Sequence, residues 1–370
     1  MNNKKIKIIC SNNTGIEGDA IQQLKNTSEL DGMVYAYGMP DIHPGKGHPI
    51  GASFLSKDII YPYLIGNDIG CGMSLYEIDL KKMKQDKTVK KIKGIELPMD
   101  ESIAKSILDD FEIDHNYVSS LGTIGGGNHF AEFQLVDQII NEELFLKYNL
   151  DKKKYYLLVH SGSRGLGESI LTSHIQKYNS KGLNKDNDDF QEYLKKHDYA
   201  LKWAKANRYA IMYRLAEQLN FNSKLICDIE HNFVEKMNDD LFLHRKGAIP
   251  SNKGIIIIPG SRGDYSYIIE PKESFLEDSL FSLSHGAGRK WKRSETKSRL
   301  SKKYSVQDLQ KTKMGSRVIC EDKQLLYEEA PMVYKNISNV INDLEEANLI
   351  NIIAIMKPFI TYKRKKICCD

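Results

Sequence analysis

Apolar residues recur at helical spacing in several parts of the chain. This pattern predicts amphipathic helices at Asp19 to Leu30, at Glu101 to Phe111 and at Pro331 to Leu349, the last with proline in its first turn. Between residues 186 and 220 the chain is polar, with apolar positions still at helical spacing. We interpret that stretch as a long helix that forms an exposed excursion.

Shorter apolar runs predict strands. The run from Lys154 to His160 is continuous and has the length of a buried strand, and His160 stands where a Gly/Ser loop begins. An isoleucine run starting at Gly254 leads into a second Gly-Ser-Arg-Gly loop at 260–263 in the same way. Short strands are also expected between residues 50 and 80. The other predicted strands are Lys5 to Cys10, Met33 to Tyr37, Lys224 to Glu230 and Ile352 to Met356.

Proline and glycine interrupt the pattern between Gly38 and Pro49, which predicts an irregular loop there. Asp41 and His43 would point the same way if that loop is extended, so it is either functional or a tight structural turn. Short strands interleaved irregularly with helices predict an α+β fold, with the active site at strand ends. We find no linker, so we expect one compact domain over 1–370 with a tail at 364–370.

Composition narrows the class of protein. With 370 residues, 41% hydrophobic and 28% charged, the chain is expected to be soluble, and no apolar run approaches the ~18 residues of a membrane helix. The N-terminus turns polar too soon for a signal peptide, which favours the cytoplasm. Six cysteines without a CxxC pair argue against a disulfide scaffold or a zinc ribbon.

Basic residues are unevenly distributed. The net charge is only +4, but eight cations between Arg289 and Lys303 are opposed only by Glu295. Such a run is often a solvated face. Because it begins four residues after His285, we favour a track for nucleic-acid phosphates.

Candidate metal ligands surround a glycine-rich turn. Asp68 precedes Cys71 by three residues, and the flanking glycines allow the carboxylate and thiolate to converge. His129, His160 and His231 lie in glycine-rich loops or at strand ends. Each alone could be an ordinary core or turn residue. Together the five donors exceed one tetrahedral site and suit two ions sharing the thiolate, with Mn²⁺, Fe²⁺, Co²⁺ or Zn²⁺ all compatible.

His285 is set apart from these ligands. It lies in Ser-His-Gly-Ala-Gly-Arg at 284–289, where a phosphate could approach the bare backbone. Imidazole can act as a nucleophile, so nucleotidyl transfer is one interpretation, and a spare ligand or plain loop residue is the other. The chain lacks the GxxxxGK[ST] and GxGxxG fingerprints and the Lys-x-Asp-Gly motif of lysine-dependent ligases.

Eight ordered motifs between about residues 15 and 363 resemble the RtcB family of RNA ligases. They are GMPDIHPGKG at 38–47, GNDIGCG at 66–72, GGGNHF at 125–130, HSGSRGLG at 160–167, EHN at 230–232, HRKGA at 244–248, PGSRG at 259–263 and SHGAGR at 284–289. The resemblance implies a ligase dependent on GTP and two Mn²⁺ ions. It would join RNA ending in a 3′-phosphate or 2′,3′-cyclic phosphate to RNA with a 5′-hydroxyl, in RNA repair or tRNA splicing.

The resemblance also implies residue roles. Asp68, Cys71 and His129 would hold one metal, Cys71 would bridge to a second metal with His160 and His231, and His285 would take GMP from GTP. Asn128 would hold phosphate, and Glu132 would read the guanine edge. Further guanylate contacts would be Phe130, Ser261, Ser266, Ala287, Gly288, Tyr334 and Lys363. Residues expected to face RNA are Asp41, His43, Lys46, Arg164 and Arg289.

Some positions depart from the family pattern. Arg262 stands where many relatives have methionine, Ser284 where many have cysteine, and the chain is short. These features resemble a compact subgroup associated with RNA repair beside a release-factor homologue, and we expect a monomer. Two other interpretations stay open: a metal-dependent phosphoesterase that opens cyclic phosphate without ligation, and a non-catalytic RNA-binding module built on the 289–303 run.

Overall fold

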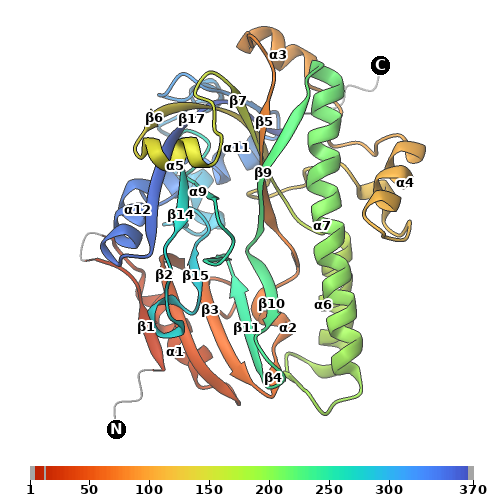
Figure 1. Ribbon diagram of the computed structural model, residues 1–370, viewed down its shortest axis with the longest axis vertical. Helices are drawn as coiled ribbons and strands as arrows, with labels where there is room; N and C mark the ends of the chain where they lie inside the picture. Colours follow the sequence, from red (N-terminus) through yellow and green to blue (C-terminus); the bar gives the residue numbers. More distant parts are fainter. Residues whose placement is uncertain (1–4, 12–13, 366–370) are drawn as a thin grey trace.

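A five-stranded sheet forms the lower part of the computed structural model, which describes residues 5–11 and 14–365 (Figure 1). Helix α1 (Gly18–Ser28) packs on it, with Ala20 and Leu24 buried against Phe54. In spatial order the strands are β1 (Ile6–Ile8), β2 (Met33–His43), β3 (Ile50–Lys57), β11 (Leu241–Lys246) and β10 (Asn232–Lys236).

Strand β2 corrects the loop predicted from Gly38. The strand continues to His43, so only the segment after His43 is irregular. Pro40 is tolerated because the pairing with β3 shifts between Gly38 and His43, and the missing N–H falls in that irregular stretch. The bulged end of β2 therefore carries Asp41 and His43 on a strand rather than on a free loop.

An eight-stranded sheet forms the upper part and holds the largest apolar cluster. Its strands in order are β13 (Ile256–Pro259), β14 (Ser266–Pro271), β17 (Ile350–Arg364), β6 (Phe130–Ile139), β7 (Tyr155–Ser161), β5 (Gly72–Ile78) and β9 (Ser223–Glu230), with β16 (Arg317–Cys320) paired to β17. The two-stranded sheets are β12 (Ala248–Pro250) with β15 (Ser282–Ser284), and β4 (Ile59–Ile60) with β8 (Leu183–Asn184).

Strand β17 is much longer than the predicted Ile352 to Met356. It passes through Pro358 to Arg364 because its pairing with β6 shifts between Pro358 and Ile360. The predicted helix from Pro331 is also divided. A short 3₁₀ turn, η2 (Pro331–Val333), is followed by α12 (Ile337–Glu346), whose N-cap Asn336 accepts from the Ser338 amide.

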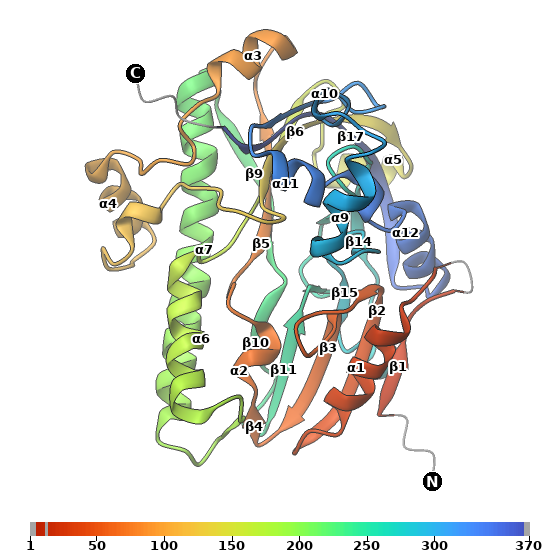
Figure 2. The same cartoon turned by 180° about the vertical axis from the view of Figure 1, so that it is seen from behind.

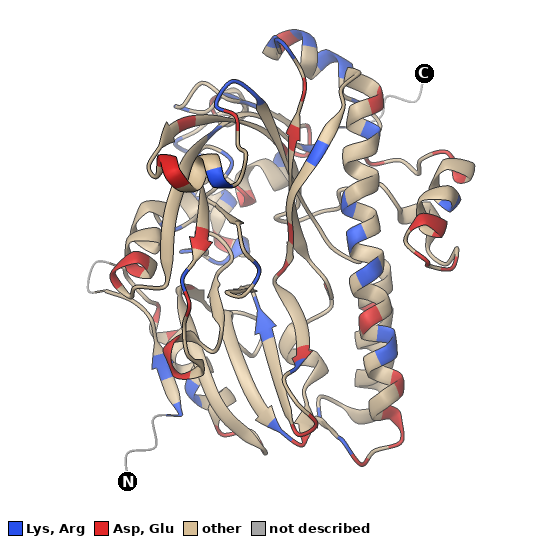
Figure 3. Ribbon diagram, in the orientation of Figure 1, with Lys and Arg blue, Asp and Glu red and all other residues tan. Residues whose placement is uncertain are grey.

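Helix α7 (Asp189–Leu219) runs beside β9 and β5 along one side of the molecule, with α6 (Gly165–Tyr178) next to it (Figure 1). The sequence predicted this helix, but the prediction that it forms an exposed excursion is wrong. One face is buried, with Trp203 and Arg208 fully enclosed, while charges of both signs occupy the rest of its length (Figure 3). The polar composition of 186–220 belongs to that outer face.

The remaining helices are short and lie around the sheets. Helices α9 and α12 lie on the opposite side of the molecule from α7 (Figure 2). The short helices not yet given are α2 (Pro62–Ile65), α3 (Gln85–Lys91), α4 (Glu101–Asp110), η1 (Val118–Ser120), α5 (Glu142–Lys147), α8 (Leu276–Ser279), α9 (Arg293–Leu300), α10 (Val306–Gln310) and α11 (Lys323–Glu328). Mixed short-stranded sheets with surrounding helices confirm the expected α+β class. Among the described residues, no helix has the length and apolarity needed to cross a bilayer.

Candidate active site

Adjacent strand ends bring the candidate metal ligands together. Strands β6, β7, β5 and β9 are consecutive and antiparallel, so the start of one meets the end of the next. Cys71 immediately precedes β5 and His129 immediately precedes β6. His160 lies near the end of β7, and His231 directly follows β9. Residues distant in sequence therefore converge at one edge of the sheet.

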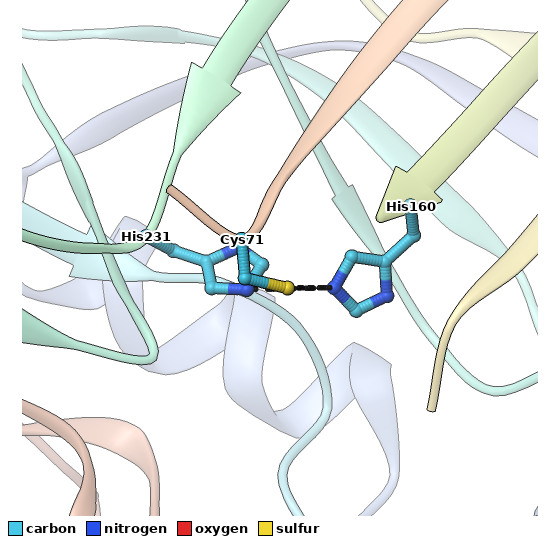
Figure 4. Close-up of side chains that lie close together, drawn as sticks. All are labelled: Cys71, His160 and His231. Carbon is cyan, nitrogen blue, oxygen red and sulfur yellow. Dashed lines mark hydrogen bonds between the residues drawn. The ribbon is translucent and has the colours of Figure 1, made fainter. Parts of the chain in front are cut away.

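The donor atoms form two groups that share the sulfur of Cys71, and each group could hold a metal ion. Cys71 Sγ lies 3.2 Å from His160 Nε2 and 3.3 Å from His129 Nε2. His160 Nε2 lies 3.4 Å from His231 Nε2, and both rings point toward the sulfur (Figure 4). The groups are Asp68, Cys71 and His129, and Cys71, His160 and His231.

The chemistry of this donor set fits a cation. His129 Nδ1 donates to the Ile124 carbonyl at 3.0 Å, which leaves Nε2 as an acceptor facing Asp68 Oδ2 at 2.8 Å. Two acceptors at that separation are stabilised by a positive charge between them. Asp68 Oδ1 and His231 Nδ1 are buried without a hydrogen-bond partner among the described residues. Such unsatisfied buried atoms are typical of a ligand site.

Burial sets the protonation of these groups. It lowers the pKa of His160 and His231 well below the usual histidine value, so both imidazoles are neutral and able to bind a cation. Burial also raises the pKa of the Cys71 thiol, and Asp68 adds to that shift. For Asp68, burial opposes ionisation, but a positive charge on the His129 side outweighs it and lowers the pKa to about 2; a bound cation would supply the same kind of charge. Asp68 is therefore the ionised member of the set.

Two residues of α7 hold the strand ends from behind. Arg208 is fully buried, and its Nη1 donates to the carbonyls of Gly70 at 2.8 Å and Ser161 at 3.1 Å, each adjacent to a candidate ligand. Arg208 also forms an ion pair with Asp228 in β9. Asn207 accepts from the Gly122 amide at 2.8 Å and donates to Gly162 O at 3.1 Å. Sequence reasoning did not find these two residues, because a polar pair in a polar helix carries no distinguishing pattern.

A cavity of about 1500 Å³ opens over the metal ligands. Most residues predicted to contact nucleotide or RNA line it. They are Asn128, Phe130, Ser261, His285, Ala287, Gly288, Tyr334 and Lys363 for the nucleotide, and His43, Lys46, Arg164 and Arg289 for RNA.

His285 follows β15 and has a buried partner. Its Nδ1 donates to Asp41 Oδ2 at 2.6 Å, and its ring centroid lies 4.8 Å from that of His231. Asp41 is fully enclosed and is absent from the cavity lining, so its carboxylate faces His285 rather than the space where RNA was expected. Gly288, at a φ of +70°, permits this approach, because a Cβ there would lie 2.2 Å from the Asp41 carbonyl oxygen.

His43 is held in the neutral form beside this pair. Burial lowers its pKa to about 4, although its Nδ1 bonds to the Asp41 carbonyl at 2.9 Å. The ring lines the cavity as a neutral group.

Glu132 and Ser266 do not line the cavity in the described structure. Glu132 is 3% exposed and accepts hydrogen bonds from Gln134 Nε2 at 2.8 Å and from Thr361 Oγ1. The same Gln134 nitrogen donates to Ser266 Oγ. Burial raises the pKa of Glu132 to about 7, because both bonds and Lys363 compensate only in part. These two residues form a polar layer beneath the cavity.

Glu329 is a buried anion within a group of cations. It is 2% exposed, and its carboxylate lies 3.1 Å from Arg289 Nη1, 3.4 Å from Arg293 Nη2 and 3.9 Å from Lys363 Nζ. Burial lowers the pKa of Lys363 to about 8 despite this anion. The sequence had suggested only Glu295 as a counter-charge to the basic run. Glu329 was missed because it directly follows α11, far beyond that run.

Part of the predicted basic run faces the cavity. Its members there are Arg289, Lys290, Lys292, Arg293 and Arg299. The run is therefore not merely a solvated face, although Arg299 also pairs with Glu295 at 2.8 Å. This wall carries a net positive charge.

Comparison with known proteins agrees with this geometry. The family model described as tRNA-splicing ligase RtcB matches residues 23–107 and 104–364. An RNA-splicing ligase RtcB2 of Escherichia coli is 47% identical over 360 residues, covering 96% of this chain and 94% of that protein. A tRNA-splicing ligase RtcB of Methanococcus maripaludis is 27% identical, covering 93% and 91%. The corresponding protein of Nanoarchaeum equitans is 28% identical, covering 94% and 92%. Because the family model matches most of the chain and the Escherichia coli protein is 47% identical over nearly all of it, the chain belongs to the RtcB family of RNA-splicing ligases.

Proposed function

We propose that this protein is a GTP- and Mn²⁺-dependent RNA ligase acting in the cytoplasm. It joins a 3′-phosphate or 2′,3′-cyclic phosphate end to a 5′-hydroxyl end through a guanylate carried on His285. The observation that carries this proposal is the bond between His285 Nδ1 and the enclosed carboxylate of Asp41, beside the shared-thiolate group.

The Asp41 bond determines what His285 can do. A carboxylate accepts hydrogen bonds, so the imidazole proton resides on Nδ1 and the lone pair of Nε2 is available. Because His285 lines the cavity next to His231, that lone pair has access to a phosphate bound over the metal ligands. Asp41 thus plays the orienting role that a carboxylate has beside other reactive histidines.

The reaction follows in three transfers. Nε2 of His285 attacks the α-phosphorus of GTP, and the bond to pyrophosphate breaks as the N–P bond forms. An oxygen of the RNA 3′-phosphate then attacks this phosphorus, the N–P bond breaks, and His285 is regenerated. Finally the 5′-hydroxyl attacks the activated 3′-phosphate, loses its proton and releases GMP. A cyclic phosphate must first be opened by water to give the 3′-phosphate.

Asp68, Cys71, His129, His160 and His231 would hold the two Mn²⁺ ions, consistent with their mixed oxygen, nitrogen and sulfur donors. Bound there, the cations would offset the negative charge that gathers on the phosphates during transfer. The chain's own cations, among them Lys46, Arg164 and Arg289, line the same cavity and would position the RNA phosphates.

Incubation with Mn²⁺ and GTP labelled at the α-phosphate tests the proposal. We expect an acid-labile, alkali-stable adduct on the wild-type chain and none on His285→Ala. A matched control is His115→Ala, a histidine that pairs with Asp109 outside the cavity. An Asp41→Asn variant should slow adduct formation by about 10²–10⁴-fold, because an amide that donates to Nδ1 leaves the proton on Nε2.

The alternatives give different outcomes. A phosphoesterase without ligation would form no adduct and would still open cyclic phosphate in a Mn²⁺-dependent way. A non-catalytic RNA-binding module would show salt-sensitive RNA binding that survives Cys71→Ala, with neither adduct nor ligation. Joining of the two RNA ends by wild type, lost in both His285→Ala and Cys71→Ala, would exclude both.

A further inference from the structure

Two aromatic rings, those of His48 and Tyr63, lie side by side on the cavity wall. Their centroids are 4.9 Å apart, and 35° separates their planes, so the two rings form one tilted aromatic surface. Both side chains are half-buried, which leaves part of each ring accessible. Burial lowers the pKa of His48 and raises that of Tyr63 to about 12, so neither ring is charged at neutral pH. The pair therefore offers π faces, and no ion, to a ligand in the cavity.

Neighbouring side chains hold the His48 ring in place. Thr27 Oγ1 donates its only proton to the Gln23 carbonyl at 2.7 Å, so it accepts from His48 Nδ1 at 2.8 Å. The Gln23 side chain also exchanges two hydrogen bonds of 3.0 Å with the backbone of Gly45, in the loop that carries His48. A surface fixed in this way loses little conformational entropy when a ligand binds.

The aromatic pair belongs to the side of the cavity formed by the five-stranded sheet. His48 lies in the loop between β2 and β3, and Tyr63 lies in α2, which packs against β10 and β11. Residues expected to hold guanylate come from the eight-stranded sheet, since Ser261 follows β13 and Lys363 lies in β17. His285 stands between the two sides, bonded to a carboxylate of β2 and next to a ring that follows β9. A guanylate held by the eight-stranded side would leave the aromatic pair free for RNA.

Aromatic rings beside a cation are a common means of binding single-stranded nucleic acid, because the rings stack with bases and the cation meets phosphates. Lys46 supplies the cation, since it is exposed, lines the cavity and lies two residues before His48. Tyr63 lies five residues before Asp68, so the chain leads from the aromatic pair directly to a candidate metal ligand. We propose that His48 and Tyr63 form a platform on which the terminal base of one RNA end to be joined stacks. This inference rests on the proposed function and adds a base contact to the expected phosphate contacts.

Binding of short fluorescent RNAs to the Mn²⁺-loaded protein, followed by anisotropy, tests the platform without GTP. One RNA ends in a 3′-phosphate and another begins with a 5′-hydroxyl. Each is compared with an analogue that lacks the base of its terminal nucleotide. For wild type we expect one of the two abasic analogues to bind about tenfold more weakly than its parent, the size of one stacked base. The strand that shows this loss identifies the end that the platform holds.

Tyr63→Leu removes the ring and keeps an apolar side chain in its place. The variant should bind the intact RNA about tenfold more weakly and should no longer distinguish it from the abasic analogue. A phosphate contact or a general loss of structure would instead weaken both RNAs equally and keep their ratio at about ten. That result would overturn the inference, as would equal binding of parent and abasic RNA by wild type for both strands. Tyr199→Leu changes a half-buried tyrosine outside the cavity and should keep the wild-type ratio.

The ligation steps give a second readout. In Tyr63→Leu, half-maximal joining should require about tenfold more of the strand that the platform holds, while the GMP adduct reports whether the variant folds. If Tyr63→Leu forms no adduct, His48→Leu serves in its place, because His48 lies in a loop. Absence of an adduct on wild type would refute the proposed function. The anisotropy comparison needs neither GTP nor ligation, so it would still test the platform, with equal affinities refuting it.

Discussion

At the scale of single residues, the site works by fixing which histidine nitrogen carries the proton. The Ile124 carbonyl does this for His129, and the Asp41 carboxylate does it for His285. In both rings Nε2 is left as a lone pair. For His129 that lone pair faces Asp68 and Cys71, where a cation fits. Among the described residues, His285 belongs to neither of the two ligand groups. The same arrangement thus suits His129 for binding a cation and, under the proposed function, His285 for nucleophilic attack.

Glu132 leads to a pH prediction at this scale. Burial raises its pKa to about 7, so below pH 7 it is protonated. If Glu132 accepts from the guanine N–H groups, as the family resemblance implies, that protonation removes acceptor capacity. The pKa of Lys363 is lowered to about 8, so above pH 8 it loses its charge. We expect GTP affinity to rise through pH 7 and decline above about pH 8.

Calorimetric titration of GTP across pH 5.5–9 would measure this profile, with the range chosen to bracket the two pKa values of about 7 and about 8. Glu132→Gln should lose the rising limb and keep the decline, because the amide does not titrate. A rising limb that persists in Glu132→Gln would assign the titration to another group.

At the scale of elements, helix α7 supports the ligand-bearing strands. Its Arg208 bonds to carbonyls adjacent to Cys71 and His160, and its ion pair reaches β9, which ends next to His231. A single side chain thus contacts the backbone beside two candidate ligands and a carboxylate of the strand that leads to a third.

Replacing Arg208 should impair both stability and metal binding. We expect Arg208→Met to lower the free energy of unfolding by about 3–5 kcal/mol, because Asp228 is left as an unpaired charge. Mn²⁺ affinity should fall at least about tenfold, the usual effect of replacing a residue that holds metal ligands in position. Urea denaturation and calorimetric Mn²⁺ titration would measure the two effects.

A double variant separates positioning from stability. Arg208→Met with Asp228→Leu removes the unpaired charge, so stability should partly recover while Mn²⁺ affinity stays low. Recovery of both together would mean that Arg208 acts only through the stability of the fold. Lys202→Met, an exposed cation on the same helix, is the control and should change neither quantity by much.

At the scale of the whole molecule, the cavity lies where the two large sheets meet. The five-stranded sheet supplies Asp41 and His43, the eight-stranded sheet supplies the metal ligands, and the segment after β15 supplies His285. Two cations bound by Asp68, Cys71 and the three histidines would join four strands and a turn. Metal binding should therefore stabilise the folded protein as a unit.

Thermal unfolding with and without Mn²⁺ measures this coupling. Mn²⁺ at 100 times its dissociation constant should add about 2.7 kcal/mol, a shift of a few degrees for a chain of this size, and chelation should reverse it. Cys71→Ala should abolish most of the shift because both groups share this sulfur. Cys10→Ala, an exposed cysteine, should keep it. A full shift in Cys71→Ala would place the bound metal elsewhere.

The sequence by itself determined the local features. Periodicity identified α1, α4 and α7, and the apolar run before His160 identified β7, because amphipathic spacing and buried-strand composition are written in neighbouring residues. Motif chemistry likewise selected the metal donors that the fold brings together, since ligand type and glycine spacing are local. The family resemblance added the expected identity, which the comparisons confirm.

Only the tertiary structure decided the features that depend on distant partners. Asp41 and His285 are 244 residues apart, and no pattern near Asp41 distinguishes an orienting carboxylate from an RNA contact. Strands β2 and β17 continue through proline because neighbouring strands supply irregular pairing that local propensity does not contain. Glu329 and Arg262 stand out only because they are buried charges beside the cavity. Burial is a property of the packed chain, so it could not be read from residue order.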